Sequence, residues 1–243
     1  MYQKIGFIQL AIGIAIDDNI ILTLGSTIKE LEKSGKFTIQ NLSVPINAPP
    51  NVPRFVLNSK EYVINISLDR LDFYFSIPDH MAQHPITTIK YISKLIEEIN
   101  QIFLSSIVYK WCGIVMKVNY PYKDNQDSKL TNIFDSITSI DRNNDDVVSL
   151  TFNFGVKKGW YFKTIGIAEY QSHVLLGEQM KNQQIHLDDE NLSERGIEIT
   201  LDYNNKPNVK NNSFIIDIMK LLNLTIPDIN NLPKNTNLLE ILT

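Results

Sequence analysis

Alternation of apolar and polar residues with a period of two recurs along this chain, and it limits the possible folds more than any other feature. In residues 5–16 an isoleucine or leucine occupies every second position from Ile8 to Ile16. Residues 62–68 and 71–77 alternate in the same way. Side chains of a strand point alternately to its two faces, so each stretch predicts a strand that buries one face only. We therefore expect an antiparallel sheet with one covered face.

Apolar residues at helical spacing occupy other parts of the chain. The longest such stripe consists of Ile86, Ile89, Ile92, Leu95, Ile96, Ile99, Ile102 and Phe103. Shorter stripes lie in residues 20–31 and 129–140 and begin again near Ser213. Amphipathic helices of this kind cover the apolar side of a sheet. The predicted fold class is α+β, an antiparallel sheet with helices on one face.

The order of these elements repeats. KIGFIQLAIGI (4–14) resembles KWCGIVMKVNY (110–120), and YVINISLDR (62–70) resembles GIEITLDYN (196–204). We predict a duplicated β-α-β(3-4)-α unit, with a first repeat in 1–106 and a second in 107–243, packed as one globular unit. The alternative is chance likeness between strands in a chain rich in isoleucine and asparagine. The predicted order is similar to that of the TATA-binding-protein-like fold, but a fold alone does not carry a function.

Composition narrows the class of protein. The 243 residues are 43% hydrophobic and 21% charged, which is typical of a globular chain. A net charge of −4 disfavours nucleic-acid phosphate as the main partner, because such binding depends on lysine and arginine. The single cysteine, Cys112, excludes an intrachain disulfide. The apolar N-terminal stretch lacks a small-residue cleavage site and is too short to span a bilayer, so we expect a cytoplasmic protein without membrane contact.

Several segments also resemble a sporadically distributed, uncharacterised family of bacterial proteins of similar length. The segments that carry the resemblance are YVINISLDRLDFYFSIP (62–78), CGIVMKVNYPY (112–122) and GIEITLDYNNKP (196–207), together with the first strand and helix. The resemblance implies no assigned activity and no catalytic residues. The patchy distribution of the family implies a context of mobile elements or antiviral (phage) defence.

Catalytic motifs are scarce. The chain contains no phosphate-binding glycine loop and no GxSxG motif. Asp69 and Asp202 each follow an Ile-Ser/Thr-Leu strand, so two carboxylates related by the duplication could hold Mg²⁺ or share a proton. The alternative, which we favour, is that each aspartate accepts hydrogen bonds from turn amides.

Two histidines and the cysteine are further candidates. His80 and His84 have the HxxxH spacing of a metal site, but they precede Pro85 and lack a third local ligand, so a solvated loop and helix N-cap is the favoured interpretation. Cys112 lies on a predicted strand, where a lone cysteine is usually packing.

The sheet face opposite the helices is the more informative candidate. Its predicted binding residues are Asn65, Ser67, Tyr74, Asn119, Thr151, Asn153 and Thr200. Uncharged hydrogen-bonding groups with a tyrosine suit contact with a protein or a small ligand, because they are easier to desolvate than ions. An ordinary solvated sheet face is the alternative.

These observations predict a non-enzymatic protein-binding or assembly subunit of a bacterial multi-protein system, without a cofactor. Two other functions stay open. One is a metal-dependent acid–base enzyme, of hydrolase or nuclease type, using Asp69 and Asp202. The other is nucleic-acid binding through a curved sheet, which the net charge disfavours.

Overall fold

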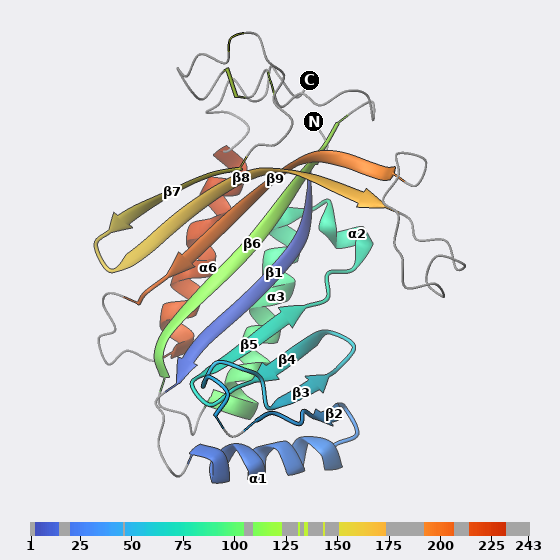
Figure 1. The fold of residues 1–243 in the computed structure, drawn as a ribbon, viewed down its shortest axis with the longest axis vertical. Coiled ribbons are helices and arrows are strands. Elements are labelled where there is room, and N and C mark those ends of the chain that lie inside the picture. Colours follow the sequence, from blue (N-terminus) through green and yellow to red (C-terminus); the bar gives the residue numbers. More distant parts are fainter. Residues whose placement is uncertain are drawn as a thin grey trace.

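Nine antiparallel strands form one continuous sheet in the order β2-β3-β4-β5-β1-β6-β9-β8-β7 (Figure 1). The computed structural model describes residues 3–14, 20–45, 47–104, 109–122, 131, 134–135, 143, 151–173, 192–206 and 214–231. The strands are β1 (Lys4–Ile14), β2 (Thr38–Asn41), β3 (Phe55–Asn58), β4 (Tyr62–Ile66), β5 (Arg70–Phe75), β6 (Tyr109–Pro121), β7 (Thr151–Lys158), β8 (Tyr161–His173) and β9 (Leu192–Asn204).

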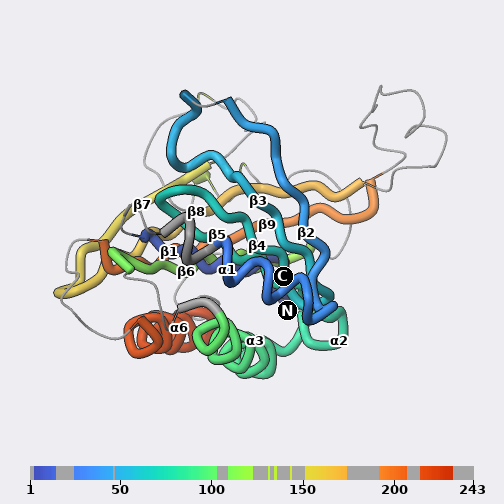
Figure 2. Tube along the Cα trace, turned by 90° about the horizontal axis from the view of Figure 1, so that it is seen from below, coloured from blue at the N-terminus to red at the C-terminus, as the bar shows by residue number. Residues whose placement is uncertain are grey.

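The long helices lie on one side of this sheet. They are α3 (Pro85–Ile99), which continues as the π-helical turn η1 (Asn100–Leu104), and α6 (Phe214–Asn231). Figure 2 shows α3 and α6 next to each other beneath the sheet, whereas α1 (Ile20–Lys33) lies near β2 at one end and α2 (Asp79–Ala82) precedes α3. The predicted α+β class, with helices on one face of an antiparallel sheet, is confirmed. None of the described helices combines the length and the apolar character needed to cross a bilayer.

The strand order is symmetric about the central β1–β6 pair. On one side β1 is followed outward by β5, β4 and β3, and on the other side β6 is followed by β9, β8 and β7. Helix α3 comes after β5, and α6 comes after β9. This arrangement makes β5 the topological counterpart of β9, although likeness of sequence matches β9 with β4. The duplication and its boundary at residues 106 and 107 stay predictions.

The core follows from the alternation along the two central strands. In β1, Ile8, Leu10 and Ile12 are fully buried, and in β6 the buried residues include Ile114 and Met116. Register pairs Ile8 with Met116 and Leu10 with Ile114, so these side chains form one apolar layer. The apolar stripes of α3 and α6 cover that layer with Ile92, Ile96, Ile99, Ile218, Leu221 and Leu222.

A buried carboxylate fixes the start of α6 against β6. Asp217 is 2% exposed, and its Oδ2 accepts hydrogen bonds from the Tyr109 hydroxyl at 2.8 Å and from the Asn205 amide at 3.1 Å. The side-chain oxygen of Asn205 accepts in turn from the backbone N–H of Cys112 at 2.8 Å. A buried charge is tolerated when hydrogen bonds satisfy it, as they do in this network.

The extent of α6 differs from the prediction. The strands predicted for residues 5–16 and 147–154 are described as β1 up to Ile14 and as β7 from Thr151, and the other residues of both predictions lie outside the described part of the chain. Helix α6 runs through Pro227 to Asn231, farther than its apolar stripe indicates, because Tyr203 and Lys163 of the sheet both contact Asp228 beyond the proline. Most of the helix predicted at 129–140, and the short one after Asn235, lie outside the described residues.

Substitution of Asp217 by alanine should destabilise the protein by about 3 kcal/mol, because it removes two hydrogen bonds to a charged acceptor and leaves buried donors unpaired. Tyr109→Phe, which removes one donor, should cost about 1 kcal/mol. Urea denaturation measures both, with Glu97→Ala on the exposed side of α3 as the control. Equal stability of Asp217→Ala and the wild type would show that this contact does not fix α6.

Candidate functional site: the open face of the sheet and the β7 edge

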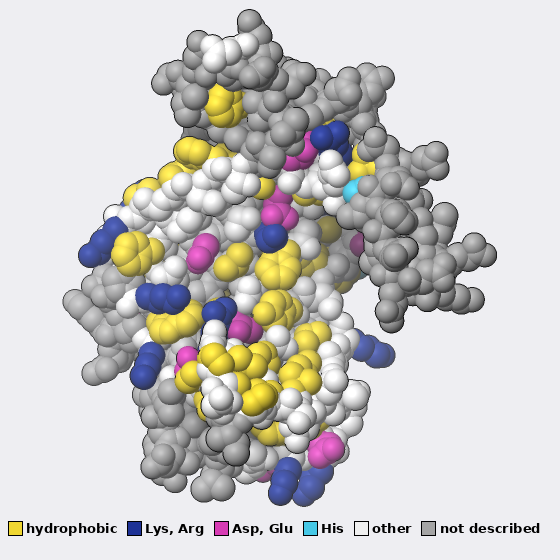
Figure 3. Space-filling view, viewed as in Figure 1, with side chains coloured by type: hydrophobic (Ala, Val, Ile, Leu, Met, Phe, Trp, Pro, Cys, Tyr) yellow, Lys and Arg dark blue, Asp and Glu magenta, His cyan; other side chains and the backbone are white. Residues whose placement is uncertain are grey.

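The open face is the side of the sheet opposite α3 and α6, which faces the reader in Figures 1 and 3. Six of the seven predicted binding residues lie on it: Asn65, Tyr74, Asn119, Thr151, Asn153 and Thr200. They alternate with buried core residues, as period two requires. Thr151 and Asn153 are exposed, and the other four are half-buried.

These six residues do not converge. They lie on strands from β4 to β7, which are six strand spacings apart, or roughly 30 Å across the sheet. The seventh predicted residue, Ser67, is 4% exposed in the turn after β4. Its hydroxyl donates to the Arg70 carbonyl at 2.8 Å, so it closes the hairpin. The predicted residues of the open face are therefore spread over a broad platform, and Ser67 is not part of it.

Two lysines of the open face are paired with glutamates of β9. The Lys4 ammonium lies 2.6 Å from Glu194, and the Lys117 ammonium lies 2.8 Å from Glu198 on the neighbouring strand. Figure 3 shows positive and negative groups interspersed with hydrophobic ones on this face. Paired cations have little left to offer a phosphate. The contact of Lys4 with Glu194 has no sequence signal, because 190 residues separate the two partners.

A second network surrounds Asp72 on β5. Its Oδ1 accepts from the Arg70 guanidinium Nε at 2.7 Å and from the Gln9 amide at 2.8 Å. Tyr74 lies beside it, with its ring 6.0 Å from that of Phe7. Burial, and secondly the Asp72 charge, raises the pKa of Tyr74, so its phenol stays protonated at neutral pH. The network presents hydrogen-bonding groups in fixed positions.

Glycines let large side chains lie flat on the open face. A Cβ on Gly13 would meet the Trp111 indole at 2.0 Å, and one on Gly166 would meet the Asn153 side chain at 2.6 Å. Asn119 lies over Gly6 in the same way, at 3.0 Å from the position of a Cβ. Glycines on one strand thus make room for side chains from the next.

Trp111 is the largest side chain of this face, and it is absent from the binding residues predicted from the sequence. Its ring lies over Gly13, with the Lys206 ammonium 4.2 Å and the Arg70 guanidinium 5.6 Å from the ring centre. Cation–π contacts of this geometry hold an aromatic ring in place. The only sequence signal is an aromatic residue at a position of β6 that faces away from the core.

The two aspartates considered for catalysis are far apart. Asp69 lies in the β4–β5 turn, where its backbone carbonyl accepts from the Ile14 N–H at 2.9 Å. Asp202 lies within β9, opposite Val115 of β6, and accepts from Asn204 at 3.3 Å. Three strand spacings and about five residues along the strands separate them, which amounts to about 20 Å. The structure does not bring them together. Asp202 lies in β9, whose topological counterpart is β5, whereas Asp69 follows β4.

The other candidates for chemistry do not form a site among the described residues. His80 lies in α2 and His84 at the N-cap of α3, and both are exposed. Among the described residues, no group of three or more histidine, cysteine, aspartate or glutamate side chains could hold a metal ion. Cys112 is fully buried, and burial followed by the Asp217 charge raises the pKa of its thiol far above neutrality. A protonated, buried thiol is not a nucleophile.

Strand β7 forms an edge of the described sheet and carries an apolar face. All eight of its residues are exposed, and Phe152, Phe154 and Val156 are 37%, 40% and 36% exposed. These three side chains point to the helix side of the sheet, but α6 packs on β6 and β9 instead. The rings of Phe152 and Phe154 lie 5.8 Å apart. A long edge strand with exposed apolar side chains is a site for pairing with another strand.

Comparisons with known proteins give no further guide to this site, since the chain matches no protein-family model and no curated protein.

Substitution of Gly13 by alanine should displace the Trp111 indole, because the new methyl group would occupy its place. We expect a loss of about 1–3 kcal/mol in stability. In a Trp160→Phe background, the emission of Trp111 should change in wavelength or intensity. Gly25→Ala is the control, because a Cβ on Gly25 meets nothing within 4 Å. Unchanged Trp111 emission in the Gly13 variant would contradict the seating of this ring on β1.

Proposed function

We propose that this protein is a non-enzymatic binding or assembly subunit that joins other polypeptides through the β7 edge. The observation that carries the proposal is the exposed apolar face of β7 formed by Phe152, Phe154 and Val156. Adding a strand to β7 would satisfy the outward-facing backbone groups and bury these side chains, at a gain of about 1 kcal/mol for each. The flat open face would extend the contact beyond that edge.

A second copy of the chain is the occupant that β7 fits best. Two β7 strands paired antiparallel about Phe154 would place Phe152 opposite Val156 of the other copy, and Phe154 opposite its own mate. Lys157 would face Thr151 of the other copy, so the cationic ends would stay apart. Aromatic and β-branched cross-strand pairs stabilise antiparallel sheets. Such a two-fold contact closes on itself and forms a dimer.

The other functions considered receive less support. Nucleic-acid binding needs unpaired cations, whereas Lys4, Arg70 and Lys117 of the open face each contact a carboxylate. The acid–base enzyme needs Asp69 and Asp202 together, and about 20 Å separates them. The bacterial mobile-element or defence context stays a prediction from the sequence resemblance.

The mass of the protein in solution tests the proposal. Size-exclusion chromatography with light scattering should give a mass above the 27.9 kDa monomer at high concentration and approach the monomer on dilution. A small interface built on one strand should dissociate in roughly the micromolar range or above. The double variant Phe152→Ser, Phe154→Ser should be monomeric at every concentration, because it removes the apolar pairs.

Ile216→Ser is the matched control. Ile216 is 50% exposed on α6, so its substitution removes an equally accessible apolar side chain away from β7. It should leave the mass unchanged. A wild type that stays monomeric and co-purifies with no stoichiometric partner would overturn the proposal. If it stays monomeric but holds a different protein, and the double variant releases that protein, the occupant is a strand of that partner.

A further inference from the structure

Lysines and aromatic rings alternate across one end of the open face, from β7 to β6. Register places Lys157 of β7 opposite Phe162 of β8, and Phe162 opposite Asn204 of β9. The Lys206 ammonium, just past the end of β9, lies over the indole of Trp111 on β6. We call Lys157, Phe162, Lys206 and Trp111 the cation–aromatic row. Figure 3 shows positive and hydrophobic side chains side by side at this end of the face, near the β7–β8 turn.

Both lysines of the row lie over a ring and keep their charge. The Lys157 ammonium is 6.0 Å from the centre of the Phe162 ring, and the Lys206 ammonium is 4.2 Å from the centre of the Trp111 ring. Both lysines are exposed, and neither contacts a carboxylate among the described residues. A cation–π contact positions an ammonium without neutralising it. The row therefore holds two positive charges in defined places.

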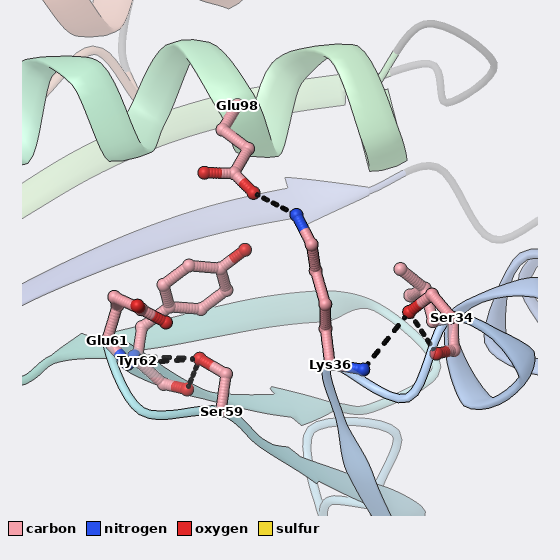
Figure 4. A network of polar contacts seen from close by, with 7 residues as sticks. Ser34, Lys36, Ser59, Glu61, Tyr62 and Glu98 are labelled. Atoms are coloured by element: carbon pink, nitrogen blue, oxygen red, sulfur yellow. Dashed lines mark hydrogen bonds and ion pairs between the residues drawn. The ribbon is translucent and has the colours of Figure 1, made fainter.

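Other cations of the molecule are paired with carboxylates. On the helix side, Lys36 lies 3.4 Å from Glu98 (Figure 4). Arg70, which also lies near the indole, forms a salt bridge with an aspartate of its own strand. Asp202, the carboxylate of β9 beside the row, accepts a hydrogen bond from Asn204 at 3.3 Å and no contact from a lysine. The unpaired charge is thus concentrated at this end of the open face.

The two rings of the row are accessible from the open face. Phe162 is 37% exposed, and Trp111 is half-buried. Two strand spacings and about two residues along the strands separate them, which amounts to about 12 Å. That separation is more than three times the spacing of roughly 3.4 Å between stacked bases. The rings would therefore meet different bases of one extended nucleic-acid strand.

The direction of the row indicates which polyanion fits it. The row crosses β8, β9 and β6, and each of these strands is paired with a neighbour on both sides. A peptide laid along the row would gain no backbone hydrogen bonds. A single-stranded nucleic acid needs none, because its bases stack on rings and its phosphates meet cations. The bases of a duplex are stacked on one another and do not reach the rings.

We propose that the cation–aromatic row binds single-stranded nucleic acid, with bases on Phe162 and Trp111 and phosphates at Lys157 and Lys206. This activity goes beyond the proposed assembly function and does not depend on it, because the exposed apolar side chains of β7 point to the helix side instead. Two unpaired cations in a chain of net charge −4 limit the affinity. We expect a Kd of roughly 10–100 µM at about 50 mM salt.

Fluorescence anisotropy with labelled oligothymidylate and oligouridylate, each about eight nucleotides long, tests the proposal. Both should bind, because no group of the row selects the sugar. In a Trp160→Phe background, binding should also quench the emission of Trp111. A duplex of about twelve base pairs should bind at least about fivefold more weakly. No binding of either single strand up to about 1 mM, or equally tight binding of the duplex, would overturn the proposal.

Variants of the row separate the phosphate contacts from the base contacts. The double variant Lys157→Gln, Lys206→Gln should reduce the slope of log affinity against log salt by about 1.4, since each phosphate contact of a single strand contributes about 0.7. Phe162→Ala should weaken binding by at least about fivefold, because it removes one stacking surface.

The matched control is the double variant Lys90→Gln, Lys220→Gln, which removes the same charge from α3 and α6. Lys220 also lies over a ring, that of Trp160 at 6.0 Å, but on the helix side of the sheet. The control should leave the salt slope unchanged, and equal slopes in both double variants would contradict the phosphate contacts. If octaglutamate bound as tightly as the oligonucleotides and Phe162→Ala altered neither affinity, the row would be a site for acidic polypeptides and the proposal would be wrong.

Discussion

The pairing of β1 with β6 is the constraint on which the rest of the structure depends. These strands lie at the centre of the sheet and join the two halves of the chain in antiparallel register, with Gln9 opposite Val115. Because the buried residues Ile8, Leu10, Ile114 and Met116 of these strands point to one side, α3 and α6 both lie on that side, where they contact each other. Within the described residues, no helix layer covers the opposite side (Figure 2). A shift of one residue in this register would exchange the two faces.

Much of this fold could be predicted from the sequence, because one-sided burial leaves a visible alternation. Ile64 and Ile66 mark β4 as clearly as Ile89 and Ile92 mark α3. The alternation of apolar residues does not predict an element boundary that is determined by tertiary contacts. Pro227 predicts a break, but the contacts of Asp228 with the sheet keep α6 helical beyond it.

The candidate site was predictable only in part, for a related reason. Alternation assigns Tyr74 or Thr200 to the open face, but it does not reveal which residue of a distant strand lies beside them. The pairing of Lys4 with Glu194 depends on that register, and so does the seating of Trp111 on Gly13. A pocket of about 470 Å³, lined by Tyr62, Tyr91 and Glu98 among others, could not be predicted from the sequence, because separate segments of the chain form it. The sequence likeness between β9 and β4 predicts matching positions for Asp69 and Asp202. In the sheet, however, the counterpart of β9 is β5, so the two aspartates lie far apart.

Two kinds of surface thus follow from one arrangement. A sheet that buries a single side leaves flat polar strands on the other, and the exposed β7 ends the described sheet where α6 no longer covers it. The pocket arises where α3 meets the first half of the sheet at its outer end.

Hydrogen–deuterium exchange of the intact protein tests the central role of β1 and β6 most directly. Both strands have neighbours on each side and bury one face in the same core, so their amides should exchange most slowly and at a common rate set by global unfolding. If instead the amides of β1 and β5 opened at a rate different from those of β6 and β9, the two halves would be independent units. That result would contradict a single core built on the β1–β6 pair.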